Sequence, residues 1–319
     1  MVRETTDVVS QLTAVIVGRN RLSSLICTIN SLLRADVHVD KITYIDTGST
    51  GQMIDRVRDL YPEIEIICIV GGNPQRARNI GGSAAQTPYI LFSDDDVEFS
   101  RFSITNALQL IERHDEIGVI GWNTYEDGQA ARSNGYTLMS PLWLSRDGKM
   151  KSWVGAIRVY TIRNAYLMRT ETFRLLGGWD EDLFIQFDEN DICYRSYLLG
   201  KIVACIGDAT IVDINNRTRN PLSFVDELGL DRYSLGVRNS VLVALKNASF
   251  PVLLFIFPFS VCFTLIRGAI DGNFRRTLRG LSSSFPLFSK FLEKRRQTRL
   301  ISWKKDIFML FHLLKEEAV

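Results

Sequence analysis

The sequence predicts an α/β fold in which helices flank a mostly parallel central sheet. Apolar runs of strand length alternate with segments of helical periodicity over the first hundred residues, an order typical of parallel sheets. The run at residues 89–92 leads directly into Asp94, Asp95 and Asp96. In an open α/β sheet the carboxyl ends of the strands face the ligand crevice. The acidic residues are therefore expected at a binding site.

The elements are expected in the following order. Residues 13–17 are a β-branched run typical of a central first strand, and apolar residues recur at helical spacing from Leu22 to Leu33. We expect strands over residues 13–17, 41–45, 64–70 and 89–92, and helices over residues 22–33, 53–60 and 74–85. A further helix begins near Ile192 and closes at Gly200, and residues 209–212 form the last core strand.

Composition restricts the class of protein. The chain has 319 residues, 46% hydrophobic and 23% charged, with a formal net charge of +2, which excludes wholesale disorder. Three histidines leave little for a zinc site or a Ser-His-Asp hydrolase. The five cysteines show no Cys-x-x-Cys spacing, so we expect buried thiols in a reducing compartment. Residues 1–7 show no signal-peptide pattern.

The three consecutive aspartates at the end of the 89–92 strand repel one another unless a cation lies among them. Mg²⁺ or Mn²⁺, held by one or two carboxylates and completed by phosphate oxygens and water, suits this arrangement. The alternative is an acidic surface turn. Arg78, on the preceding helix, could bind a diphosphate with its planar guanidinium, or could be a solvated helix charge.

A second acidic cluster follows Gly177 and Gly178. Asp188 is expected to cap a helix, with Asp191 as the reciprocal cap. Glu189 has no such structural role and could project into the cleft as a general base. Trp179 could stack on an acceptor sugar or pack in the core. The segment 122–160, with Trp122, Trp143 and Trp153, has little periodicity and is expected on the acceptor side.

Five motifs together resemble glycosyltransferase family 2 of the GT-A fold, in order and spacing, over residues 13–212. They are Ile16-Val17 with Asn20, residues 45–50 (Ile-Asp-Thr-Gly-Ser-Thr), residues 77–81 (Ala-Arg-Asn-Ile-Gly), residues 89–96 and residues 177–181 (Gly-Gly-Trp-Asp-Glu). Residues 183–195 and the C-terminal tail look like the bacterial rhamnosyltransferase and galactofuranosyltransferase branches.

This resemblance implies an inverting, metal-dependent transfer from a nucleoside-diphosphate sugar, such as dTDP-rhamnose or a UDP-sugar. The acceptor would be a glycan or polyprenol-linked glycan of cell-surface polysaccharide synthesis. By the same resemblance, Asp46 would contact the nucleotide and Arg78 the diphosphate. The remaining donor-binding residues would be Val17, Arg19, Asp94 and Asp95.

The resemblance also assigns the metal, the base and the acceptor side. Asp96 would bind Mg²⁺ or Mn²⁺ most directly, together with Asp94. Relatives often place a histidine after the last core strand, where this chain has Asp213, so we expect Asp213 to replace it as an oxygen ligand. Glu189 or Asp188 would be the base, with Glu189 favoured. The acceptor-side residues would be Gly178, Trp179 and Asp191.

Residues 1–220 are then expected to form the catalytic domain, with a donor half over about 1–100 and an acceptor half over about 101–220. Residues 221–319 form a helical, apolar and basic C-terminal region. Its uncharged stretch, residues 247–266, contains two prolines and precedes eleven basic residues between Arg267 and Lys305. A single span would send these charges to the far side, against the positive-inside preference. We expect interfacial helices on the inner face of the cell membrane and a cytoplasmic enzyme.

Several alternatives remain open at this point. The C-terminal helices could instead pack on the catalytic domain or form a homo-oligomer. Nucleic acid is disfavoured as a partner, because the basic residues alternate with long apolar runs. A nucleotidyltransferase would need a glycine-rich basic signature near the first strand, and residues 18–21 match it poorly. An inactive glycan-binding scaffold is disfavoured because donor, metal and base positions all carry usable side chains.

Overall fold

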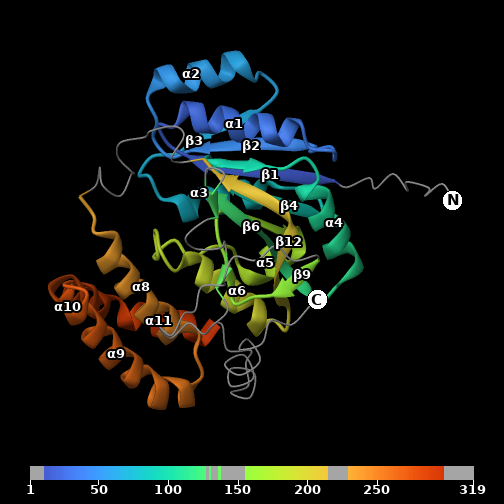
Figure 1. Ribbon diagram of the computed structural model, residues 1–319. Helices are drawn as coiled ribbons and strands as arrows, with labels where there is room; N and C mark the ends of the chain where they lie inside the picture. The colour runs from blue at the N-terminus through green and yellow to red at the C-terminus, as the bar shows by residue number, and fades with distance from the viewer. Residues whose placement is uncertain (1–10, 127–128, 131–135, 138–154, 215–228, 298–319) are drawn as a thin grey trace.

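The computed structural model describes residues 11–126, 129–130, 136–137, 155–214 and 229–297. They form an α/β body and a cluster of C-terminal helices beside it (Figure 1). Most of the predicted acceptor segment 122–160, including Trp143 and Trp153, lies outside these residues. Trp122 is a fully buried core residue, and its Nε1 donates to the carbonyl of Ser103 at 2.9 Å.

The first half of the body is the predicted alternation of strands and helices. Its strands are β1 (Leu12–Gly18), β2 (Lys41–Asp46), β3 (Glu65–Cys68) and β4 (Tyr89–Asp94), and its helices are α1 (Leu22–Leu33), α2 (Gly51–Leu60) and α3 (Pro74–Ala84). β1 is parallel to β2 and β4, and β2 is parallel to β3. All of β1 is buried, as expected for a central strand covered on both faces. β3 is shorter than the predicted 64–70 strand.

The second half adds strands beyond β4. Its longer elements are β5 (Val97–Phe99), α4 (Ser103–Arg113), β6 (Ile117–Glu126), β11 (Ala165–Arg169), α5 (Thr170–Leu176), α6 (Asp188–Leu198) and β12 (Ile202–Asp213). The short strands are β7 (Gln129–Ala130), β8 (Tyr136–Thr137), β9 (Ala156–Arg158) and β10 (Thr161–Ile162). The predicted 209–212 strand is therefore the end of the longer β12.

The main sheet has the order β3-β2-β1-β4-β11-β6-β12-β5. β11 is antiparallel to both β4 and β6, whereas β6 and β12 are parallel. The prediction of an α/β fold with a mostly parallel sheet is confirmed, with β11 as an inserted antiparallel strand. Antiparallel neighbours need no crossover helix, so the helix-strand alternation on which the prediction rested carried no signal for β11.

Helical segments make up the C-terminal region: α8 (Arg232–Asn247), η1 (Val252–Ile256), α9 (Phe257–Ile270), α10 (Phe274–Ser284), η2 (Phe285–Leu287) and α11 (Phe288–Gln297). α6 contacts both the sheet and α8, and α10 and α11 contact α8. Leu183, just before α6, is buried against Leu242, Val243 and Phe291 of α8 and α11. The helices are thus packed on the α/β body.

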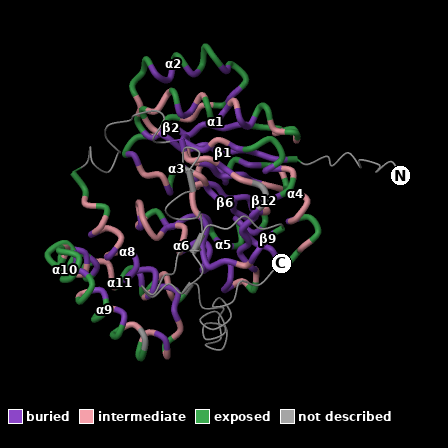
Figure 2. Tube along the Cα trace, in the orientation of Figure 1, coloured by how far each residue is buried: buried purple, intermediate pink, exposed green. Residues whose placement is uncertain are grey.

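Much of α9 and α10 is exposed (Figure 2), and large apolar side chains are among the exposed ones. Val252–Ile270 is long and apolar enough to cross a membrane, judged by length and composition only. The exposed large apolar side chains of this region include Phe250, Leu254, Phe255, Phe259, Ile266, Ile270, Phe274, Leu278 and Phe285. An apolar surface of this extent is unusual on a protein that contacts only water.

The cysteines differ from expectation. All five are free, and only Cys193 and Cys205 are buried. The prediction of buried thiols is wrong for Cys27, Cys68 and Cys262, which are exposed. Cys68 ends β3, the edge strand of the sheet, and the other two lie on outward-facing positions of α1 and α9.

Candidate functional site

Acidic side chains meet where the parallel strands end. Asp46, the last residue of β2, is level with Gly18 of β1, and Asp94, the last residue of β4, is level with Val17. The two aspartates therefore flank the end of β1 at one edge of the sheet, as predicted. A side chain at Gly18 would collide with the carboxylate of Asp95. Glycine at this position lets the acidic turn pack against β1.

Asp46 organises the turn that follows β2. Its Oδ2 accepts hydrogen bonds from the backbone N–H groups of Gly48 at 3.0 Å and Ser49 at 2.9 Å, which is an Asx-turn. The hydroxyl of Tyr44 donates to its Oδ1 at 3.2 Å. The guanidinium of Arg19 lies beside Gly48. Asp46 thus shapes the loop at the predicted nucleotide site, and its contact with a nucleotide stays a prediction.

Arg21 lies between the other two aspartates of the acidic turn. It forms an ion pair with Asp95, and its Nη1 donates to Oδ2 of Asp96 at 2.5 Å. The cation that three adjacent carboxylates require is therefore supplied in part by the chain itself.

The acidic turn keeps an excess of negative charge in spite of Arg21. Burial raises the pKa of Asp96 to about 8; Arg21 opposes this shift, and the charges of Asp95, Asp94 and Asp213 add to it. Burial likewise raises the pKa of Asp95 to about 6. Asp213 ends β12, which pairs with β5 directly after Asp96, so the structure brings Asp213 to the acidic turn.

The predicted metal ligands are all carboxylates. Within the described ranges, no three Asp, Glu, His or Cys side chains lie close enough to ligate one ion. Asp96 together with Asp94 or Asp213 offers one or two hard oxygen ligands, which is the number that Mg²⁺ uses when phosphate oxygens and water complete its shell. The raised pKa of Asp96 indicates that a further cation would be favoured there. The donor set fits a divalent ion that binds together with a phosphorylated ligand.

α3 is specified locally by its first residues. The side chain of Asn73 accepts hydrogen bonds from the N–H groups of Gln75 and Arg76, and Pro74 occupies the first turn. Asparagine is a strong N-cap and proline is favoured at the first helical position. The start of the helix is thereby fixed, and with it the placement of Gln75 and Arg78 one turn apart.

Arg78 joins the two acidic motifs. Its Nη2 lies 2.6 Å from Oδ1 of Asp94, and its Nη1 lies 3.6 Å from Oδ2 of Asp188. Gln75 donates to the same Oδ2 of Asp188 at 2.7 Å and accepts from Arg78 at 2.9 Å. Burial lowers the pKa of Arg78, but the two carboxylates outweigh this and raise it. The alternative of a solvated helix charge is wrong, because only 6% of the side chain is exposed.

A strained turn precedes α6. Phe184, Gln186 and Phe187 have φ angles of 61°, 71° and 61°, in the left-handed region that costs a non-glycine residue about 1–3 kcal/mol. Phe187 occupies the N-cap position and makes no side-chain cap. The predictions that Asp188 caps the helix and that Asp191 forms a reciprocal cap are therefore wrong. Asp188 is the first residue of α6.

Asp188 and Glu189 lie in different environments. Asp188 is buried, and its pKa is raised well above the usual range by burial and by the charge of Glu189, while Arg78 opposes the shift. Glu189 is half-buried. Oδ2 of Asp188 accepts a hydrogen bond from Gln75 and lies 3.6 Å from Arg78, so this carboxyl is engaged by the chain itself. The geometry therefore favours Glu189 as the proton acceptor of the pair.

Trp179 packs in the core of the loop between α5 and α6. It is 3% exposed, its ring meets those of Tyr166 and Phe92 edge to face, and the guanidinium of Arg78 lies 5.0 Å from its centroid. Of the two roles that the sequence left open, core packing is the one that the structure shows. A ring buried in this way has no free face for an acceptor sugar.

Gly178 is required by the backbone. Its φ is +74°, and a side chain at this position would collide with Oδ1 of Asn79, which accepts a hydrogen bond from the N–H of Trp179 at 2.7 Å. The other polar atom of the Asn79 amide donates to Glu181 at 3.0 Å. Gly178 thus allows the loop 177–182 to dock on α3.

Tyr166, on β11, lies among the same charged groups. It is fully buried, and this burial is the main cause that raises its pKa well above the usual value. The charge of Glu189 is the second cause. Its hydroxyl has no hydrogen-bond partner among the described residues. The nearby charges include Arg78, Asp188 and Asp94. A neutral phenol is therefore available as a hydrogen-bond donor in this part of the site.

Asp191 has a structural role. It is fully buried and accepts hydrogen bonds from Arg195 at 2.8 Å and Asn247 at 2.8 Å, and Lys246 lies 2.8 Å from its Oδ1. Burial opposes ionisation, but Arg195 and Lys246 outweigh it and lower the pKa of Asp191. No surface of this carboxylate is left for an acceptor, so the predicted acceptor contact does not fit its position.

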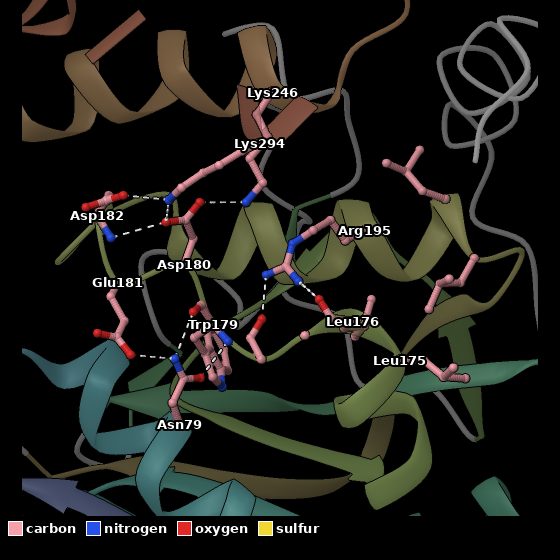
Figure 3. Close-up of a pocket in the computed structure, with 14 residues that line it drawn as sticks. Asn79, Leu175, Leu176, Trp179, Asp180, Glu181, Asp182, Arg195, Lys246 and Lys294 are labelled. Atoms are coloured by element: carbon pink, nitrogen blue, oxygen red, sulfur yellow. Dashed lines mark hydrogen bonds and ion pairs between the residues drawn. The ribbon is translucent and has the colours of Figure 1, made fainter. Parts of the chain in front are cut away.

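A cavity of about 540 Å³ lies between the loop 177–182, α6, α8 and α11 (Figure 3). Lys246 and Lys294 converge on Asp180, and Lys294 also binds Asp182 at 2.6 Å. The described residues that line this cavity do not include Asp94, Asp96, Asp188 or Glu189. The cavity is therefore separate from the acidic edge of the sheet.

The family model for glycosyl transferase family 2 matches residues 13–172, which is half of the chain. The match runs from β1 into α5 and includes Asp46, Arg78, Asp94 and Asp96. The chain belongs to glycosyl transferase family 2. That family consists of inverting glycosyltransferases that use nucleotide sugars. No functionally curated protein matches the chain.

Solved glycosyltransferase structures share the fold. GalNAc-T7, bound to UDP, GalNAc and Mn²⁺, matches 95% of this chain with a TM-score of 0.67 and 15% identity, and the chain spans only 57% of GalNAc-T7. A mannosyltransferase from Pyrobaculum calidifontis with GDP-Man and Mn²⁺ matches 95% of this chain, and 85% of its own length, with a TM-score of 0.52 and 12% identity. The structure of TarS 1-349 from S. aureus in complex with UDP matches 95% of this chain, and 90% of its own length, with a TM-score of 0.51 and 16% identity. At these identities the likeness confirms the GT-A fold.

Three residues of this family 2 glycosyltransferase site were missed from the sequence. Arg21 follows the motif residue Asn20 in the loop after β1, and its partners lie in the acidic turn. Gln75 lies one helical turn before Arg78, a spacing that places both on one face of α3. That spacing was a usable signal. Tyr166 lies on β11, for which no strand was predicted, so nothing placed it near the acidic residues.

Proposed function

We propose that this family 2 glycosyltransferase transfers a sugar from a nucleoside-diphosphate donor to a glycan or polyprenol-linked acceptor, with Mg²⁺ or Mn²⁺. One observation carries the proposal. Arg78 is a buried cation held between Asp94, at the donor edge, and Asp188, next to the candidate base. This bridge places the metal-binding motif and the base motif on opposite sides of one guanidinium.

The donor would lie along the carboxyl edge of β1, β2 and β4. Val17, Arg19 and Asp46 would border the nucleotide side, and Asp94 and Arg78 the diphosphate side. Asp95, also predicted to bind the donor, is fully buried, so a direct donor contact does not fit its position. Asp96, with Asp94 or Asp213, would hold the divalent ion. When bound, that ion supplies Lewis-acid stabilisation of the charge on the leaving diphosphate. Arg21 neutralises the rest of the acidic turn.

Glu189 would take the proton from the acceptor hydroxyl as its oxygen attacks the anomeric carbon. Gln75 and Arg78 hold Asp188 in place beside Glu189. Direct displacement of the diphosphate inverts the anomeric carbon and needs no covalent intermediate. The neutral hydroxyl of Tyr166 is available to donate a hydrogen bond to either substrate.

The donor we favour is dTDP-rhamnose or a UDP-sugar. This rests on the likeness of residues 183–195 and the C-terminal tail to the rhamnosyltransferase and galactofuranosyltransferase branches. UDP and GDP-Man are the nucleotide ligands of the solved structures above. A role in cell-surface polysaccharide synthesis follows from the same likeness.

The enzyme would work from the inner face of the cell membrane. The exposed apolar residues of α9 and α10 alternate with the exposed basic residues Arg267, Arg275 and Arg279. Helices of this kind lie in the membrane interface, with apolar side chains in the acyl boundary and Arg on anionic headgroups. A polyprenol-linked acceptor would be at hand there.

The deciding experiment is a donor screen on the full chain in detergent with Mn²⁺. Release of nucleoside diphosphate is followed from dTDP-rhamnose, UDP-sugars and GDP-mannose. Wild type is compared with Glu189→Gln and Asp96→Ala, and with Glu171→Gln as a control at an exposed glutamate of α5. We expect metal-dependent release from one donor, lost in the first two variants and kept in the third.

Two other outcomes are informative. Metal-dependent nucleotide binding without release would mean that an acceptor is needed, and the screen would be repeated with polyprenol-linked glycans. Neither binding nor release with any donor would overturn the proposal and favour an inactive glycan-binding scaffold.

A further inference from the structure

We infer that Asn239 of α8 is a positioning residue for the transfer reaction. It belongs to the C-terminal helices, yet it holds the turn 183–187 that leads into Asp188 and Glu189. The inference rests on the proposed role of Glu189 as the base, and it extends the active site to α8 of the C-terminal helices.

The contacts of Asn239 are all with one feature. The side chain is fully buried, and its Nδ2 lies 2.6 Å from the backbone carbonyl of Leu183, 2.8 Å from that of Ile185 and 2.8 Å from that of Gln186, so its two hydrogens are shared among the three carbonyls. Its Oδ1 accepts from Nε of Arg238 at 2.9 Å. The carbonyl oxygens can only accept hydrogen bonds, so the NH2 group of the amide must face them. Arg238 donates to the amide oxygen on the other side, and the orientation of the amide is therefore fixed.

The turn needs this support. Phe184, Gln186 and Phe187 are non-glycine residues in the left-handed region, a conformation that persists only where the surroundings impose it. The N-cap residue offers no side-chain hydrogen bond to α6. Asn239 engages three carbonyls of the turn from one side. Gln75 of α3 donates to the carbonyl of Phe184 at 3.0 Å from the other.

A purely structural role for Asn239 does not account for this pattern. α8 is fastened to the body by other contacts, namely Lys246 with Asp180 and Asn247 with Asp191, and neither involves the turn. The side chain of Asn239 contacts three backbone carbonyls within residues 183–186. Glu189 lies three residues after this segment. A shift of this turn would move the carboxylate of Glu189 relative to the donor edge, to which Arg78 and Asp94 stay anchored.

The test compares Asn239→Leu, which keeps the volume but removes the donor, with Asn239→Ser, which keeps one hydroxyl donor. The matched control is Ser234→Ala on the same helix; Ser234 is buried, and its hydroxyl binds Asp231 and the carbonyl of Arg276 only. Each full-length variant is measured for kcat and KM with the donor found in the screen, for nucleoside-diphosphate affinity, and for hydrogen exchange of residues 183–191. Glu189→Gln serves as the reference for loss of the base.

We expect Asn239→Leu to lower kcat by about tenfold or more, since small displacements of reacting groups have effects of this size. Donor KM and nucleotide affinity should stay within about twofold, because the donor edge is untouched. Asn239→Ser should be intermediate. Exchange in 183–191 should rise in both and stay at the wild-type level in Ser234→Ala. If Asn239→Leu does not fold, Asn239→Ser tests the inference instead. A lowered kcat together with raised hydrogen exchange in residues 183–191 would support it.

An Asn239→Leu protein with the kcat and exchange of Ser234→Ala would overturn the inference while leaving the proposed function intact. A fall in nucleotide affinity equal to the fall in kcat would also overturn it, since that points to general loosening. A wild-type protein without turnover would overturn the proposed function instead. The exchange measurement would still show whether Asn239 orders the turn.

Discussion

Gln75 donates a hydrogen bond to Oδ2 of Asp188 at 2.7 Å, across 113 residues of sequence. The same amide nitrogen donates to the carbonyl of Phe184, and the amide oxygen accepts from Arg78. One fully buried side chain of the donor half therefore contacts the acid beside the base, the turn before it and the bridging cation. The two acidic motifs are held together by this contact.

The variant Gln75→Leu should lose both stability and activity. It leaves the carboxyl of Asp188 and the carbonyl of Phe184 buried without this donor, and an unsatisfied buried group costs about 1–3 kcal/mol. We expect the free energy of unfolding in urea to fall by about 2 kcal/mol or more, together with a loss of donor turnover. Gln86→Leu, at an exposed position, should change stability by no more than about 0.5 kcal/mol. Equal stability of the two variants would rule out the role given to Gln75.

The acidic turn should make the metal-free protein less stable as the pH rises. The pKa of Asp96 is about 8 in the folded protein and 3.8 in its ordinary state, so the folded state binds the extra proton between these values. Stability then decreases from about pH 4 to pH 8. Asp95, with a pKa of about 6, acts in the same direction over a narrower range. The lowered pKa of Asp191 affects stability only in more acidic solution.

Thermal unfolding of the metal-free protein between pH 5 and pH 8 tests this expectation. The midpoint should fall across the range, and Asp96→Asn, which removes the titrating group, should flatten the decrease. Mn²⁺ with nucleoside diphosphate should raise the midpoint more at pH 8 than at pH 5, because the ion binds the ionised carboxylate. A slope that Asp96→Asn leaves unchanged would assign the effect to other groups.

Two lysines of the C-terminal helices should differ sharply in their effect on stability. Lys246 has 5% of its side chain exposed and binds Asp180 and Asp191, whereas Lys290 is 54% exposed and binds Asp182. Removing one partner of a buried ion pair costs about 3–5 kcal/mol, and an exposed pair contributes about 1 kcal/mol or less. Urea unfolding of Lys246→Met and Lys290→Met should reproduce this difference. Similar values for the two would mean that Asp180 and Asp191 find other partners.

Membrane attachment should depend on the apolar side chains of η1 and α9. The double variant Phe255→Asp, Phe259→Asp places charges at two exposed apolar positions, 73% and 65% accessible, and should weaken binding to vesicles of phosphatidylglycerol and phosphatidylcholine by about tenfold or more. Nucleotide affinity should not change. Co-sedimentation with vesicles measures both the loss and its salt dependence.

The matched control for this prediction is Leu33→Asp, Val70→Asp, which alters two exposed apolar residues of the α/β body. It should bind vesicles as wild type does. If neither pair of substitutions has an effect, or if wild type does not sediment with anionic vesicles, the exposed surface of α9 is not a membrane contact. Concentration-dependent self-association of wild type would then point to a homo-oligomer.

The sequence predicts the donor half well, because each of its elements has a recognisable local sequence pattern. β1 is a continuous β-branched run, α3 begins with Asn73 and Pro74, and β4 ends in the acidic triplet. Parallel strands also require helices between them, so the order of elements already implies that Asp46 and Asp94 share an edge. The register of β1 with its two neighbours confirms this.

The acceptor half is less predictable because long-range contacts override local signals. Asp188 and Asp191 have the spacing of a capping pair, but Gln75 and Arg78 engage the first and Lys246 and Arg195 the second. Local spacing carries no information on partners 55 to 113 residues away. β11 was missed for a related reason, since its antiparallel pairing with β4 and β6 is also a long-range contact that the local sequence does not signal.

The contacts of α8 and α11 with the loop 177–182 have a consequence for how this enzyme can be divided. A cut at residue 220, the predicted domain boundary, would remove Lys246, Lys294 and Asn239 from one fragment and leave Asp180 and Asp191 with buried negative charge. It would also uncover Leu183. A folded α/β fragment is not expected from a cut at this point, because α8 and α11 complete the interior around the turn 183–187. We expect these two helices to unfold together with the α/β body.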